Sequence, residues 1–212
     1  MEIKILKLKS SNWPAVYEAL KRSNLEPLVL EPYKIDLINE NDLIIIPGVG
    51  NIYSLSSEIE QNFGVSRFRE LIITKKVKVI GICLGFQFLC SSSEEDSSAE
   101  CLNLFNYSVD SIFKPSRPSV GWNKIYTKNI FKSQNKLPQL CNEYFYFTHS
   151  FGVKVTNNFS KEEYVFQYEV QEKESIVGAI IHKDFIGFQF HPEKSGEEGI
   201  KLLCNSINFL TT

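Results

Sequence analysis

The stretch VKVIGICLGFQFLC, residues 77–90, starts as an apolar run and breaks at Gly81-Ile82-Cys83-Leu84-Gly85. The run predicts a buried strand over 77–82, and the residues after Cys83 predict a helix. A cysteine between two glycines at such a junction has the form of a nucleophile elbow, a tight and strained turn that projects the side chain above the sheet. As a bare pattern, it fits a packed cysteine near a turn equally well.

The segments before this stretch indicate the surrounding fold. Apolar runs at 27–32 and 43–47 are typical of strands buried on both faces, and 3–8 is a further expected strand. Helix-like segments lie between and after them, including 66–76, and Asn12 is a candidate cap for the first helix. Alternating strands and helices predict a parallel sheet with helices on both faces.

The second half of the chain is rich in aromatic, strand-like segments separated by turn residues. These segments are 122–127, 143–155, 162–170, 175–184 and 185–190. The serine-rich piece 91–98 is expected to be a loop, and apolar spacing predicts a closing helix over 196–210. We therefore expect a single domain, 1–212, with a three-layer α/β/α fold. Its sheet would be mixed and mainly parallel, with an antiparallel extension.

Composition limits the classes of function. Of the 212 residues, 43% are hydrophobic and 23% charged, which is typical of a globular protein. The net charge of -2 gives no electrostatic reason to expect nucleic acid as a partner, and no apolar run has the length of a membrane span. Five cysteines without a CxxC pair argue against a disulfide framework or a zinc site. We expect a reducing, cytoplasmic compartment.

A cysteine nucleophile needs a base, and the chain has three histidines, His149, His182 and His191. His191 is followed two residues later by Glu193, a carboxylate that could orient its imidazole as in a catalytic triad. His182 has Asp184 at the same spacing, so spacing alone leaves the choice open.

Residues 47–50, Pro-Gly-Val-Gly, follow the expected strand 43–47. Glycines at a strand end let backbone N–H groups face a ligand, which suits the second half of an oxyanion hole. A plain tight turn explains an isolated segment of this kind equally well. No Gly-Lys-Ser/Thr follows, so the segment is not a phosphate-binding P-loop.

Three of these segments, PGVGN, GICLGFQFL and GFQFHPEKSG, occur in an order that resembles the class I (triad) glutamine amidotransferases. Within that class, GWN at 121–123 and YFYFTHSF at 144–151 are similar to motifs of the glutaminase subunit of imidazole glycerol phosphate synthase. The resemblance covers residues 43–205. It implies hydrolysis of L-glutamine to glutamate and ammonia through a thioester, without a metal or cofactor.

The resemblance also implies a role for each matching residue. Cys83 would be the nucleophile, His191 the acid and base, and Glu193 the residue that orients His191. The oxyanion would be held by N–H groups of Leu84 and of the loop at Val49 and Gly50.

Glutamine recognition is carried over in the same way. Gln87 and Gly50 match residues that contact glutamine, and Glu95 matches a residue that pairs with its ammonium group. Because Glu94 is adjacent to Glu95, that assignment could shift by one. The backbone of Ser150 and Phe151 matches the segment that lies along the substrate.

The resemblance further implies a heterodimer, in which ammonia passes through a tunnel to a cyclase (synthase) subunit. The isolated subunit would show little activity until the partner organises the oxyanion loop. Two partner-facing segments depart from the family: 7–12 keeps only Asn12 of the usual Asp-Tyr-Gly-x-Gly-Asn, and Pro118-Ser119-Val120 replaces Pro-His-Met.

These departures leave alternatives beside the histidine-pathway subunit, which we place first. One is a paralogous glutaminase that supplies ammonia for amidation of a surface-polysaccharide sugar. A second is a non-catalytic protein that only binds a partner. A third is a free-standing cysteine hydrolase, which the glutamine-binding matches disfavour.

Overall fold

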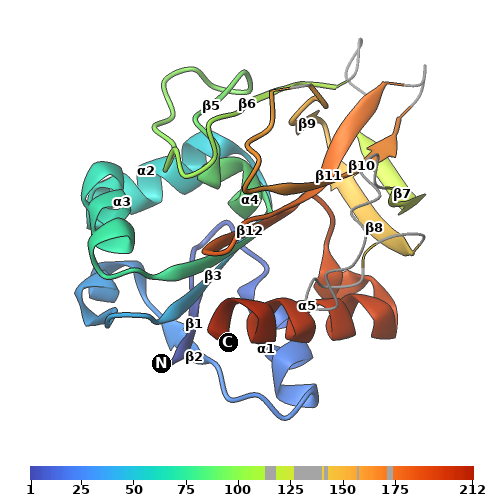
Figure 1. Cartoon of the computed structure of the whole chain (residues 1–212). Helices are drawn as coiled ribbons and strands as arrows, with labels where there is room; N and C mark the ends of the chain where they lie inside the picture. Colours follow the sequence, from blue (N-terminus) through green and yellow to red (C-terminus); the bar gives the residue numbers. More distant parts are fainter. Residues whose placement is uncertain (113–117, 127–139, 141–142, 157, 171–173) are drawn as a thin grey trace.

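The computed structural model describes residues 1–112, 118–126, 140, 143–156, 158–170 and 174–212. Its main sheet has the strand order β10-β11-β12-β4-β3-β1-β2 (Figure 1). The parallel strands are β1 (Ile3–Leu6), β2 (Leu28–Leu30), β3 (Leu43–Gly48), β4 (Lys78–Cys83) and β12 (Phe185–Phe188). Antiparallel pairing adds β11 (Ser175–Ile181) and β10 (Tyr164–Glu169). The expected mixed, mainly parallel sheet is confirmed.

Helices cover both faces of this sheet (Figure 1). One face packs against α2 (Ile52–Asn62), α3 (Val65–Thr74) and α4 (Leu84–Leu89). The other packs against α1 (Trp13–Arg22) and α5 (Gly196–Thr211). Each face has its own cluster of buried aliphatic and aromatic side chains, because strands covered on both sides are apolar on both sides.

Two smaller sheets come from the segment between α4 and β10. β7 (Ser119–Lys124) and β8 (Tyr144–His149) form an antiparallel ribbon, and β5 (Ser92–Ser93), β6 (Ser108–Ser111) and β9 (Phe151–Gly152) form the other sheet. Short 3-10 helices occupy η1 (Pro32–Leu37) and η3 (Pro192–Lys194). The strand expected over 143–155 therefore breaks at Ser150, between β8 and β9.

Three local expectations were wrong. The strand at 27–32 is not buried on both faces: β2 is the sheet edge, so Leu28 and Val29 are exposed. The serine-rich segment 91–98 was expected to be a loop but contains the short strand β5, which follows the end of α4 at Leu89. Asn12 precedes α1 without capping it through its side chain. The last residue of the strand expected over 122–127 lies outside the described residues.

The register of the sheet determines where a site can form. Gly48 at the end of β3 lies beside Cys83 at the end of β4, and Phe188 of β12 lies beside Ile82. The carboxyl ends of these three strands therefore meet at one edge, the usual place for a ligand site in an open α/β sheet.

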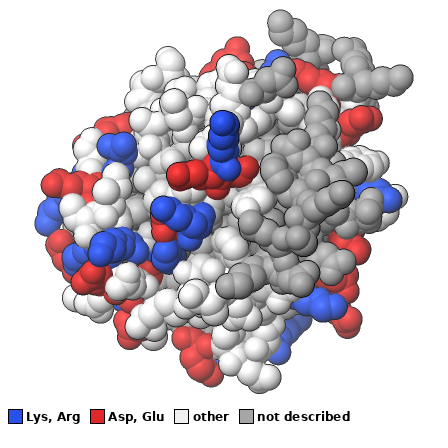
Figure 2. Space-filling view, in the orientation of Figure 1, with Lys and Arg blue, Asp and Glu red and all other residues white. Residues whose placement is uncertain are grey.

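The surface carries charges of both signs. On the face shown in Figure 2, Lys and Arg are interspersed with Asp and Glu. Within the described part of the chain, no helix has the length and apolarity needed to span a membrane. The four described cysteines, Cys83, Cys90, Cys101 and Cys204, are free thiols, and Cys141 lies outside the described residues.

Candidate active site

The turn at Cys83 has the geometry of a nucleophile elbow. Cys83 ends β4 with φ 53° and ψ -108°, a conformation that residues with a Cβ rarely adopt. A Cβ at Gly85 would lie 1.8 Å from the carbonyl oxygen of Ile46, and one at Gly81 would lie 2.7 Å from the backbone of Phe86. Glycine is required at both positions because α4 packs directly against β3 and β4.

A cavity of about 320 Å³ opens beside the Cys83 side chain. It is lined by Val49, Gly50, Cys83, Leu84, Gln87, Glu95, Pro118, Thr148, His149, Ser150, Phe151 and His191. This list contains every residue that the sequence assigned to the site except Glu193, which lies against His191. The volume is within the range of about 300–1,000 Å³ typical of small-molecule sites.

His191 lines the cavity and is held from behind by Glu193. Its Nδ1 lies 2.8 Å from the Glu193 Oε1, and both side chains are fully buried. Its Nε2 is buried and makes no hydrogen bond with any residue that the structure describes. Burial lowers the pKa of His191, but Cys83 and Glu193 outweigh burial and raise that pKa to about 9. The imidazole is thus poised as an acid beside the sulfur.

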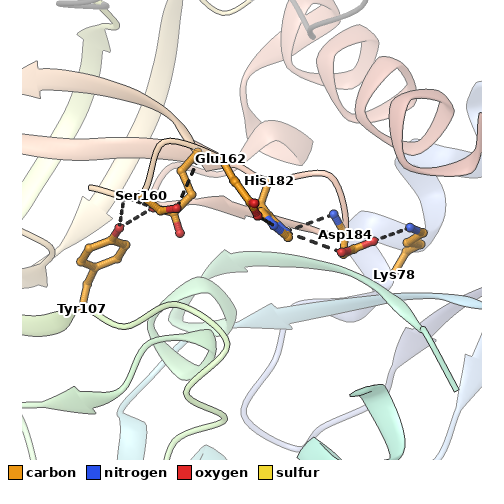
Figure 3. A network of polar contacts seen from close by, with 7 residues as sticks. Lys78, Tyr107, Ser160, Glu162, His182 and Asp184 are labelled. Carbon is orange, nitrogen blue, oxygen red and sulfur yellow. Dashed lines mark hydrogen bonds and ion pairs between the residues drawn. The ribbon is translucent and has the colours of Figure 1, made fainter. Parts of the chain in front are cut away.

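His182, the other histidine with a carboxylate two residues on, lies elsewhere. It follows β11 and precedes β12, at the opposite end of the sheet from Cys83. Figure 3 shows it in a separate polar network, with its Nε2 3.5 Å from Glu162 and with Asp184 bonded to Lys78 at 2.6 Å. The structure therefore brings His191, and not His182, to the cavity.

Asn12 is a site residue that the sequence reading missed. Its Nδ2 donates a hydrogen bond of 2.5 Å to the Glu193 Oε1, the oxygen that also contacts His191. Reading Asn12 as a helix cap hid this role. Its place in the segment between the first strand and the first helix, at the same edge of the sheet as Cys83, was the available signal.

Glu95 lines the cavity, whereas the adjacent Glu94 is exposed and accepts a hydrogen bond from the Ser111 N–H. Burial raises the pKa of Glu95, and a hydrogen bond of 2.9 Å from the Ile52 N–H to its Oε2 opposes that rise. Of the two adjacent glutamates, the structure therefore places Glu95 on the cavity.

The loop at Val49 and Gly50, which the resemblance matches to an oxyanion loop, has one of its N–H groups already engaged. The Val49 N–H donates to the carbonyl oxygen of Ser10 at 3.2 Å. An N–H bonded to another part of the protein is not available to a substrate. This loop must change its hydrogen bonding before Val49 can serve as an oxyanion donor.

His149 is a second cavity-lining histidine, and its contacts fix its tautomer. Its Nδ1 lies 2.7 Å from the carbonyl oxygen of Phe151, which only accepts, so Nδ1 carries the proton. Its Nε2 then accepts from the Tyr168 hydroxyl at 2.5 Å. Burial lowers the pKa of His149 to about 4, which makes it a neutral, structural group. It fixes the backbone at Ser150 and Phe151.

Residues 9–208 match the protein family described as glutamine amidotransferase class-I. The chain belongs to this family, and it is a glutamine amidotransferase.

Similar proteins include the imidazole glycerol phosphate synthase subunit HisH of three organisms. The Bacteroides thetaiotaomicron protein is 32% identical over 98% of this chain and 100% of its own length. The Methanopyrus kandleri protein is 32% identical over 96% of each chain. The Thermotoga maritima protein is 30% identical over 96% of this chain and 94% of its own length.

Solved structures agree on the fold. A glutamine amidotransferase structure, 13% identical, has a TM-score of 0.71 over 100% of both chains. PurLQS from Thermotoga maritima, 19% identical, has a TM-score of 0.69 over 99% of this chain and 98% of that one.

Proposed function

We propose that this chain is the glutaminase subunit of an imidazole glycerol phosphate synthase, and that it hydrolyses L-glutamine to supply ammonia to a cyclase partner. The main support for this proposal is a single cavity lined by Cys83, His191 and the residues matched to glutamine binding. The names of the relatives support the pathway.

The first chemical step forms a thioester. With the thiol proton already held by His191 as an imidazolium, the Cys83 sulfur attacks the side-chain amide carbon of glutamine as a thiolate. As the carbon–nitrogen bond breaks, His191 donates that proton to the leaving nitrogen, which departs as ammonia. Glu193 keeps the imidazole oriented, and Asn12 holds Glu193.

The second step hydrolyses the thioester. His191 removes a proton from water, the hydroxyl adds to the acyl carbon, and the carbon–sulfur bond breaks to give glutamate. The proton then returns from His191 to the Cys83 sulfur. The net change is glutamine and water to glutamate and ammonia.

Both steps pass through a tetrahedral oxyanion, for which Leu84 and the Val49–Gly50 loop would supply N–H donors. One such donor lowers the activation free energy by about 3 kcal/mol. Because the Val49 N–H is bonded to Ser10, we expect the isolated chain to turn over slowly. Docking of the substrate-loaded partner would shift this loop to its active hydrogen bonding.

The partner would dock on the ribbon of β7 and β8. Val120 and Trp122 on β7 and Tyr144 on β8 are 60%, 54% and 56% exposed, so one ribbon presents three large exposed side chains. Pro118, directly before β7, lines the cavity, so this surface adjoins the site where ammonia is released. A cyclase subunit bound here would receive ammonia without its loss to solvent.

A second candidate keeps the same reaction but changes the partner. The departures at 7–12 and at 118–120 lie in the segments expected to face the synthase. They fit a paralogue that supplies ammonia to a synthase amidating a surface-polysaccharide sugar.

Glutamate release, measured with each partner in turn, separates the two candidates. The chain is mixed with the cyclase subunit and its histidine-pathway nucleotide, or with a sugar-amidating synthase and its nucleotide sugar. We expect stimulation on the order of 100-fold with the former. Stimulation only by the nucleotide sugar would assign the paralogue, and no turnover with either would leave a protein that only binds its partner.

A further inference from the structure

Gln189 is a fully buried polar residue at the carboxyl end of β12 that the proposed reaction does not yet use. Its backbone N–H donates to the carbonyl oxygen of Gly178 at 2.9 Å, which anchors it to β11. Its side-chain Nε2 lies 3.8 Å from the Cys83 sulfur, within hydrogen-bonding distance for sulfur. On its other side, the sulfur lies 3.9 Å from the carbonyl oxygen of Thr148.

The surrounding hydrogen bonds determine which end of the Gln189 amide faces the sulfur. The Phe151 carbonyl can only accept, so the Gln87 group 2.7 Å from it must be the nitrogen. That nitrogen also lies 3.2 Å from Gln189, whose nearer atom must therefore be the accepting oxygen. The amide nitrogen of Gln189 is left facing Cys83. A flipped amide would place two donors against each other at Gln87.

We propose that Gln189 is a catalytic residue of this site, whose amide N–H donates to the Cys83 sulfur and stabilises it as the thiolate. The inference rests on the proposed glutaminase function. A donor to an ionised sulfur makes a stronger hydrogen bond than a donor to a thiol or thioester, because the bond is charge-assisted. Gln189 therefore raises the share of attacking thiolate and favours its departure when water cleaves the thioester.

The same hydrogen bonds connect the nucleophile to the backbone along the cavity. The Phe151 carbonyl accepts from both Gln87 and the His149 Nδ1. His149 is in turn held by the hydroxyl of Tyr168. Gln87 acts here as a positioning residue that fixes the Gln189 amide relative to the peptide at Phe151. Gln87 thereby links the position of that peptide to the donor at Cys83.

Alkylation of Cys83 by iodoacetamide, followed across pH by peptide mass spectrometry, tests the proposal without glutamine or partner. Gln189→Met keeps the size of the side chain and removes the donor. We expect alkylation at neutral pH to slow about tenfold and the midpoint of its pH profile to rise, as one lost charge-assisted hydrogen bond predicts. Among the described residues, His191 and Tyr168 interact electrostatically with Cys83, and His149 and Glu95 line the same cavity. All four are unchanged in the variant.

Gln167→Met is the matched control, since Gln167 is also buried but lies on β10, three strands from Cys83. It should leave the alkylation profile unchanged. Thermal melting checks the fold of each variant. If Gln189→Met does not fold, Gln189→Asn retracts the amide by one methylene and should give the same slowing.

Unchanged alkylation in a folded Gln189 variant would overturn the proposal. In the partner complex we expect Gln189→Met to lower kcat for glutamate release about tenfold and to leave KM for glutamine unchanged. A rise in KM alone would instead assign a substrate contact and also overturn it. If the proposed glutaminase function itself were wrong, the wild-type complex would release no glutamate, a result distinct from any effect of the Gln189 variants.

Discussion

Cys83 is held in a backbone conformation that costs about 1–3 kcal/mol for a residue with a side chain. With φ 53°, the sulfur rises from the end of β4 into the cavity and does not turn into the sheet. The close packing of Gly81 and Gly85 against neighbouring backbone keeps the turn in this conformation. The strain therefore places the nucleophile, and the surrounding packing offsets it.

Glu95 should carry the charge recognition of glutamine. Glu95→Gln removes the negative charge that would pair with the substrate ammonium group. Because charged hydrogen bonds contribute about 1.5–3 kcal/mol, we expect KM for glutamine to rise roughly 10- to 100-fold. Steady-state glutamate release in the partner complex measures this. Glu94→Gln, one residue away and exposed, is the control and should leave KM unchanged.

His149 should make stability depend on pH in a defined direction. Its folded pKa is about 4 against an ordinary 6.5, so between these values the unfolded chain binds a proton that the folded chain does not. The contribution of neutral His149 to the free energy of unfolding is therefore fully present above pH 6.5 and is lost as the pH falls through 4. Relative to His149→Gln, the wild type should lose up to roughly 3 kcal/mol of unfolding free energy.

Urea unfolding of both proteins across this pH range measures the difference. All other titrating groups are shared, so their contributions cancel. Parallel pH curves for the wild type and His149→Gln would show that the imidazole is not held neutral.

Local sequence patterns picked out candidate residues, but only the resemblance joined candidates that lie far apart in the chain, such as Cys83 and His191. Cys83 with its glycines, and His191 with Glu193, each form a local pattern. Asn12 reaches Glu193 across 181 positions, and no local pattern records that contact.

At the scale of elements, the contact of α4 with β3 defines the site. Gly85→Ala would place a methyl group against the Ile46 carbonyl, where no side chain can move aside. We expect α4 to be displaced and the unfolding free energy to fall by more than about 2 kcal/mol, with loss of glutaminase activity. Urea unfolding and glutamate release measure both effects.

Gly196→Ala provides the control, because Gly196 has open space around the position of a Cβ. Its φ of 66° limits the cost to backbone strain, about 1 kcal/mol. Equal destabilisation by the two variants would contradict the close-packing account of the elbow.

The core of the sheet followed from sequence because β3 and β4 are continuous apolar runs. The edge position of β2 did not, since an apolar run does not say how many neighbours a strand has. The break at Ser150 was also hidden, because the aromatic pattern continues through it. That break lets Ser150 and Phe151 line the cavity.

On the scale of the whole molecule, the cavity and the exposed ribbon lie side by side. Trp122→Ala should weaken binding of the cyclase partner by about 2 kcal/mol, roughly 30-fold, as is usual for a central interface tryptophan. Isothermal titration calorimetry measures the change. Ile73 on α3 is similarly exposed, and α3 lies on the opposite side of the molecule from β7 in Figure 1, so Ile73→Ala should leave binding unchanged.

Under the proposed function, the reaction would be divided between two subunits. The cavity holds Cys83, His191 and the residues matched to glutamine binding, while the Val49 N–H is engaged with Ser10. We therefore expect efficient hydrolysis of glutamine only when a partner alters the loop at Val49. Glutamine would then be spared hydrolysis in the absence of that partner.

Glutamate release from glutamine by the complex with the cyclase subunit and its nucleotide, compared between wild type and Cys83→Ala, tests the central claim most directly. We expect rapid release by the wild type and background release by a variant that still folds and binds the partner. Turnover that survives the loss of the Cys83 sulfur would contradict it.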